Sequence, residues 1–176
     1  AYVVGATFMV AIVDHLPGLA GKGNLAFLAI GIGAAPASVN WDLIARRIGE
    51  LNALILAAIL QISGILLPVA VGGLMATLLG ALLFGGTFLG MVSLVLTMAG
   101  RYYPTRPAKM MGKMTLAYGV AQIIGPVITG WLATQTGSYA SGLYVAAGAM
   151  LAGTALLIVL KRMEGSDAAR VQPSVC

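Results

Sequence analysis

The chain has 176 residues, of which 60% are hydrophobic and only 9% are charged, and its mean hydropathy is +0.98. Soluble domains carry about 25% charged residues, so this chain has too few polar side chains to cover a water-soluble surface. The composition excludes a soluble enzyme, a nucleic-acid binder and a disordered protein, and it predicts an integral membrane protein in contact with the lipid bilayer. The net charge of +5 indicates membrane topology, because the ten Lys and Arg residues form no dense patch.

Six apolar runs follow one another along the chain, and a membrane helix needs about 20 mostly apolar residues. The first run is too short, and the chain begins with Ala1 rather than Met, so we expect a piece of a longer protein whose first helix is truncated. Together the runs predict an all-α bundle over 1–162, followed by a polar cytoplasmic tail at 163–176. The predicted spans are 1–13, 25–40, 51–68, 74–99, 112–133 and 140–161.

The basic residues gather in alternate loops. One set of loops holds nine of the ten Lys and Arg residues, and the other set holds only Lys22. By the positive-inside rule, the nine mark the cytoplasmic side, so we expect the C-terminus and the start of the first span to be cytoplasmic.

The segment WDLIARRIGE (41–50) predicts a short charged link between the second and third spans. Its residues Asp42, Arg46 and Glu50 have the i, i+4, i+8 spacing that would let them pair in series on one helix. The link is either a solvated connection or a latch between helix bundles.

In the fourth span, Gly86 and Gly90 have the GxxxG spacing that favours tight helix packing, with cavity lining as the alternative. Thr87 and Ser93 add hydroxyl groups at mid-depth, and each can bond back to its own helix. In the third span, Gln61 is a polar group that we interpret as a packing partner rather than a ligand.

The fifth span carries Pro126 near its middle, where the ring clashes with the carbonyl of Gln122. Tyr118 lies one turn before Gln122 on the same face. These side chains either bond a neighbouring helix or form the polar wall of a central cavity. Three glycines would let other backbones approach this helix: Gly119, Gly125 and Gly130.

The sequence offers no set of residues for catalysis. All five acidic residues lie at or beyond the ends of the spans, and His15 is the one histidine. We therefore expect no enzyme, no metal site and no cofactor. Carboxylates inside a membrane are the usual relays for protons or sodium ions, and no ionisable group lies deep in a span of this chain.

Together, the six spans, the basic loop and the Tyr-Gly-x-x-Gln-x-x-Gly-Pro pattern resemble the C-terminal half of a major facilitator superfamily (MFS) transporter. The segments ARRIGELNALI, LLGALLFGGTFLG and YGVAQIIGPVITGWLA are similar to the YbfB/YjiJ branch of bacterial transporters. This resemblance implies a multi-pass protein of the bacterial inner membrane.

The superfamily has a cytoplasmic gating loop with the approximate pattern Gly-x-Leu-Ala-Asp-Arg-x-Gly-Arg. In this chain Arg47 and Gly49 match its Arg and Gly. Asp42 stands where Gly is usual, Arg46 where Asp is usual, and Glu50 where a basic residue is usual. The charges of the usual latch are therefore rearranged here. Gly125-Pro126 is similar to an antiporter motif, but it falls in a different helix, so it does not imply antiport.

The resemblance also implies alternating access, in which this bundle and an N-terminal six-helix bundle of the same protein rock around a central site for a small molecule. Helices seven, eight, ten and eleven would face that site. None of the candidate residues is charged, which favours a neutral or amphipathic solute, or charge recognition by the other half. The alternative is a stand-alone six-span module that dimerises into a carrier or channel. The candidate substrate-binding residues are Tyr2, Thr7, Thr87, Ser93, Tyr118 and Gln122.

Overall fold

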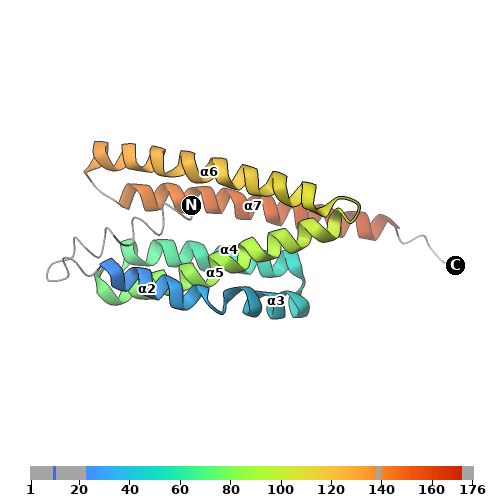
Figure 1. Cartoon of the computed structure of the whole chain (residues 1–176), viewed down its shortest axis with the longest axis horizontal. Helices are drawn as coiled ribbons and strands as arrows, with labels where there is room; N and C mark the ends of the chain where they lie inside the picture. Colours follow the sequence, from blue (N-terminus) through green and yellow to red (C-terminus); the bar gives the residue numbers. More distant parts are fainter. Residues whose placement is uncertain (1–9, 11–22, 138–139, 172–176) are drawn as a thin grey trace.

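The computed structural model of the chain describes residues 10, 23–137 and 140–171, without the side chains of 140 and 164–171. These residues form helices that run alongside one another in an elongated bundle, and no strand occurs among them (Figure 1). The all-α fold predicted from composition is therefore confirmed. The helices are α2 (Gly23–Ala34), α3 (Ala37–Ile48), α4 (Glu50–Ala70), α5 (Gly73–Tyr102), α6 (Pro107–Thr136) and α7 (Ala140–Val171).

Four stretches are long and apolar enough to cross a membrane: α4, α5, α6 and the part of α7 from Ser141 to Met163. The pair α2 and α3 can make a fifth crossing if it counts as one bent span. The predicted first span (1–13), which includes Tyr2 and Thr7, lies outside the described residues except for residue 10.

The second predicted span is not one straight helix. The chain bends by 42° between α2 and α3, next to Pro36, which has no amide hydrogen for a helical bond and restricts the residue before it. Beyond the bend, α3 continues to Ile48. The charged segment 41–50 is therefore mostly helix, and only Gly49 separates α3 from α4.

Helix α5 packs against α2, α3 and α4 through glycines that bring backbones together. A Cβ atom on Gly85 would collide with the carbonyl of Ile30 in α2. A Cβ atom on Gly80 would lie 2.6 Å from the carbonyl oxygen of Gly64 in α4. Small residues are the usual means of close helix packing in membranes, where lipid gives little hydrophobic drive for association.

The two glycines of the GxxxG pair of α5, Gly86 and Gly90, make room for one large side chain. Trp41 of α3 is 5% exposed, and its indole N–H donates a hydrogen bond of 2.7 Å to the carbonyl oxygen of Gly86. A Cβ atom on Gly90 would overlap the ring of Trp41. The ring therefore lies directly against the backbone of α5. This contact fixes α3, the second helix of the bent α2–α3 pair, to α5.

Helix α6 lies at the side of the bundle and packs only lightly on it, against α5 and α7 (Figure 1). Thr129 is its one buried residue in the described part of the chain. Gly119 and Gly130 have no neighbouring atom within 4 Å of a built Cβ. Within the described bundle no other helix comes close to these two glycines, so the expectation that they let other backbones approach stays a prediction.

Helix α7 continues beyond the apolar run that ends near residue 161, as far as Val171. The residues after Leu160 include Lys, Arg, Met, Glu and Ala, which all favour helix, so the backbone does not change where the hydropathy does. The end of a predicted span is thus not the end of a helix.

Candidate functional site

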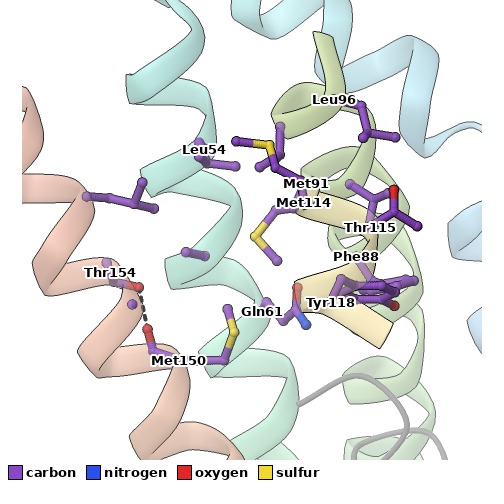
Figure 2. A pocket seen from close by; sticks show the side chains of 15 residues that line it. Leu54, Gln61, Phe88, Met91, Leu96, Met114, Thr115, Tyr118, Met150 and Thr154 are labelled. Carbon is purple, nitrogen blue, oxygen red and sulfur yellow. Dashed lines mark hydrogen bonds between the residues drawn. The ribbon is translucent and has the colours of Figure 1, made fainter. Parts of the chain in front are cut away.

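A cavity of about 600 Å³ lies between α4, α5, α6 and α7 (Figure 2). Its lining is almost entirely apolar and contains no charged side chain. The lining residues are Leu54, Ala58 and Gln61 of α4; Phe88, Met91, Val92, Val95 and Leu96 of α5; Met114, Thr115 and Tyr118 of α6; and Met150, Gly153, Thr154 and Leu157 of α7.

Gln61 is the most deeply buried polar group of the cavity, with 1% of its surface exposed. The hydroxyl group of Thr87, on α5, lies 3.5 Å from its amide oxygen and also 2.8 Å from the carbonyl oxygen of Leu83. One hydroxyl proton serves both acceptors, so the closer carbonyl takes most of the bond. The contact between Thr87 and the side chain of Gln61 is therefore weak.

The other polar groups of the lining bond mainly within their own helices. Thr154 donates to the carbonyl oxygen of Met150 at 2.8 Å, and Thr115 donates to that of Met111 at 2.9 Å. Tyr118 accepts a hydrogen bond of 2.6 Å from the amide nitrogen of Gln122, one turn further along α6. A helix satisfies such hydroxyl groups locally, so they add little polarity to the cavity.

Aromatic rings connect α5 to α6 across the cavity. The rings of Phe88 and Tyr118 stack with centroids 6.3 Å apart and planes 26° from parallel. Phe84 stacks on Phe88 in turn, with a centroid distance of 6.4 Å. Pairs of this kind contribute about 0.5–1.5 kcal/mol beyond burial. Because α6 packs lightly elsewhere, this stack is a main contact between α6 and the bundle.

Three thioethers complete the lining, from Met91, Met114 and Met150, which Figure 2 shows around the same space. Methionine is flexible and polarizable, so such a wall adapts to ligands of different shape.

The cavity lies in the part of the bundle that is nearer to the basic loops. Its lining comes from the beginning of α4 and α6, the end of α5 and the middle of α7. Those helix ends lead to the segments that contain Arg46, Arg101 and Lys161.

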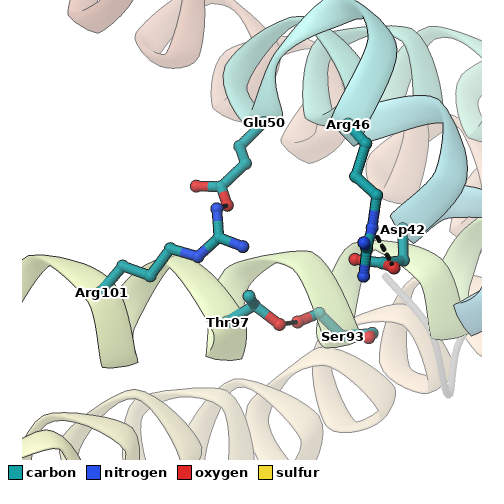
Figure 3. A network of polar contacts seen from close by, with 6 residues as sticks. All are labelled: Asp42, Arg46, Glu50, Ser93, Thr97 and Arg101. Carbon is teal, nitrogen blue, oxygen red and sulfur yellow. Dashed lines mark hydrogen bonds and ion pairs between the residues drawn. The ribbon is translucent and has the colours of Figure 1, made fainter.

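Two ion pairs lie at this end of the bundle (Figure 3). Arg46 and Asp42, one turn apart on α3, are 2.9 Å apart. Glu50 pairs instead with Arg101 at the end of α5. The first pair of the expected series, Asp42–Arg46, is confirmed. The second is not, because Gly49, with φ of +90°, ends α3 and places Glu50 on α4, where it pairs with Arg101.

The model of a family described as "Uncharacterised MFS-type transporter YbfB" matches residues 1–159, which is most of the chain. The chain belongs to this family of MFS transporters. No curated protein and no solved structure matches it. The resemblance to the YbfB branch found in the sequence is thereby confirmed, and with it a multi-pass membrane protein of a transporter family.

In this MFS chain the structure brings together only some of the predicted substrate-binding residues. Tyr118 lines the cavity, and Gln122 is bonded to it without lining it. Thr87 lies behind Gln61. Ser93 is outside the lining, and its carbonyl oxygen accepts a bond of 2.9 Å from Thr97 (Figure 3). Tyr2 and Thr7 lie outside the described residues.

Two of the helices that line the cavity were expected to do so. Helices seven, eight, ten and eleven were predicted to face the site, and α5 and α6 are the tenth and eleventh in that count. The lining from α4 and α7, the ninth and twelfth, was not expected. Gln61 was interpreted as a packing partner, which its contact with Thr87 of α5 bears out, and it also lines the cavity, which the sequence did not indicate. Its signal was the one amide in the otherwise apolar middle of α4, next to Ile62.

Proposed function

We propose that this chain takes part in secondary active transport of a small solute by alternating access. The observation that carries the proposal is the match of an MFS transporter family over residues 1–159. An uncharged cavity among four of its helices supports it, because a carrier needs a site at membrane depth that water and solute can enter. We propose no enzymatic reaction and no cofactor for it.

The partner in this proposal is a second six-helix bundle, N-terminal to this one in the same protein. The outward face of α6 supports such a partner or lipid, because it is apolar and exposed along its length at Leu116, Ile123 and Val127. In alternating access, the two bundles rock against each other around the site between them.

The proposed location is a bacterial inner membrane, with the C-terminus in the cytoplasm. The nine basic residues in alternate loops support this orientation. The cavity would then lie toward the cytoplasmic end.

The gating role proposed for Asp42, Arg46, Arg47, Gly49 and Glu50 belongs to this same end. A gate needs contacts that break at low cost, and exposed ion pairs contribute only about 0–1 kcal/mol. In the Asp42–Arg46 pair the side chains are 44% and 72% exposed, which fits such a contact. The Glu50–Arg101 pair adds a link from α4 to α5 that opens when these helix ends move apart.

The proposal is tested with the intact protein in liposomes, with an imposed proton or sodium gradient and a panel of neutral and charged solutes. We expect at least one solute to accumulate in a way that an ionophore abolishes. Solute accumulation that depends on neither the proton gradient nor the sodium gradient would overturn the secondary active mechanism. No movement of any solute beyond that in protein-free liposomes would overturn transport itself.

A further inference from the structure

We infer that the cavity between α4 and α7 is itself a binding site for an uncharged, mostly apolar small molecule with an aromatic ring and one hydrogen-bond acceptor. That this molecule is the transported solute rests on the proposed function, whereas its binding does not. The site shares α5 and α6 with the one expected among helices seven, eight, ten and eleven, and it adds α4 and α7.

The size of the cavity suits a small molecule. Sites for such ligands typically enclose about 300–1,000 Å³ and combine apolar walls with a few polar groups. This cavity encloses about 600 Å³ and has one deeply buried amide among apolar side chains.

The lining excludes a charged ligand. No lining side chain is charged, so an ion that entered would lose its hydration without gaining a partner of opposite charge. Two charged residues lie close in sequence to lining residues. Lys113, beside Met114, is exposed to the surroundings, and Glu50 is paired with Arg101. Charge on the ligand would therefore weaken binding strongly.

Gln61 supplies the polar contact. Its amide oxygen faces the hydroxyl group of Thr87, which leaves its two N–H groups to donate elsewhere. No fully enclosed side-chain nitrogen or oxygen in the described part of the chain lacks a partner. The amide nitrogen of Gln61 makes no hydrogen bond with the described residues, so it reaches the surface of the cavity, where a ligand's carbonyl, ether or ring nitrogen can accept.

The remaining walls favour an aromatic ring. Phe88 and Tyr118 present a stacked pair on one side of the cavity. The thioethers of Met91, Met114 and Met150 surround the same space (Figure 2). An aromatic ring of the ligand can stack on the Phe88–Tyr118 pair and make favourable contacts with the methionine sulfur atoms.

Three photoreactive probes test the ligand class in the intact protein, reconstituted in lipid nanodiscs. They are neutral 4-methylbenzophenone, anionic 4-benzoylbenzoate and cationic (4-benzoylbenzyl)trimethylammonium, which share one reactive group. We expect the neutral probe to label peptides that contain the cavity methionines, with saturation, at least tenfold more than either charged probe. Equal labelling by a charged probe would overturn the ligand class.

A variant that fills the cavity gives the second test. Gly153 lines the cavity and has no atom within 4 Å of a built Cβ, so Gly153→Leu adds a side chain to the cavity wall at a position where its Cβ meets no neighbour. Gly148, on the same helix, is equally unobstructed and lies outside the lining, so Gly148→Leu is the matched control. Labelling should fall at least fivefold in the first variant and stay unchanged in the second.

The amide is tested by competition. Benzophenone should displace the neutral probe better than diphenylmethane, which has the same two rings without the carbonyl acceptor. In Gln61→Leu this preference should disappear, while diphenylmethane competes as before. A preference that survives the substitution would remove Gln61 from the site.

Simple partition into lipid has its own signature. If the labelling is spread over the outward face of α6, at Leu116 or Ile123, and Gly153→Leu does not change it, the inference is overturned. A cavity filled by a lipid chain that the probe cannot displace would also overturn it. Cavity labelling without solute transport would overturn the proposed function and leave the site standing. Transport without cavity labelling would overturn the site and leave the proposed function standing.

Discussion

Gly90 shows how a missing side chain decides the contact between two helices. The Trp41 ring occupies the place where a Cβ would lie and donates to the carbonyl of Gly86. In Gly90→Ala we expect unfolding in detergent micelles to require about 1–3 kcal/mol less free energy, the usual cost of overpacking. Gly148→Ala, where the new methyl group meets nothing within 4 Å, is the control. Equal unfolding free energies in the two variants would contradict the packing described.

Gln122 affects the cavity through Tyr118, to which it donates. In the intact protein, Gln122→Ala should lower the transport rate roughly three- to tenfold, as expected for loss of one positioning hydrogen bond, while insertion and folding stay intact. Tyr118→Phe, which keeps the stacked ring and removes the acceptor, should have a similar effect. Unaltered transport kinetics in Gln122→Ala would remove this residue from the site.

At this scale the sequence predicts polarity better than position. It identified Tyr118, since a tyrosine one turn from a glutamine in an apolar helix stands out. It did not indicate that Gln61 lines the cavity or that Ser93 lies outside this lining, because which face of a helix points into a cavity depends on how the helix is rotated against its neighbours. No local pattern in α4 or α5 specifies that rotation.

The elements themselves were largely predictable, because about 20 apolar residues in a row specify a membrane helix whatever surrounds them. Their ends and bends were not. The bend at Pro36 and the single-residue link at Gly49 depend on backbone geometry that hydropathy does not register. The light packing of α6, despite its glycines, depends on what lies beyond the described bundle.

The link between α4 and α5 gives a prediction at the element scale. Arg101→Gln removes the partner of Glu50, and both groups lie at the surface end of their helices. We expect the free energy of unfolding to change by less than about 1 kcal/mol, since the Arg101 side chain is 66% exposed. The rate at which a cysteine in the cavity reacts with a water-soluble reagent should nevertheless change.

Arg47→Ala is the companion variant, since Arg47 matches the Arg of the superfamily's loop pattern. It should alter conformational switching more than solute binding. Unchanged cysteine reactivity in both variants would remove the latch from the account.

For the whole molecule, the account requires a second bundle. We expect the reading frame upstream of Ala1 to continue through six further apolar spans, which DNA sequencing determines directly. A start codon within about ten residues of Ala1, too few for another span, would instead mean that copies of this bundle assemble together. The exposed apolar face of α6 would then lie at a contact between copies or against lipid.

Under the proposed alternating access, the cavity should open to one side of the membrane at a time. The chain's only cysteine, Cys176, can be replaced by serine and a single cysteine introduced by Met114→Cys, in the cavity wall. Labelling by a membrane-impermeant thiol reagent is then compared in inside-out and right-side-out vesicles, with and without a transported solute. The account predicts fast labelling from the cytoplasmic side and a rate that the solute changes. Equal rates from both sides, unaffected by any solute, would contradict it.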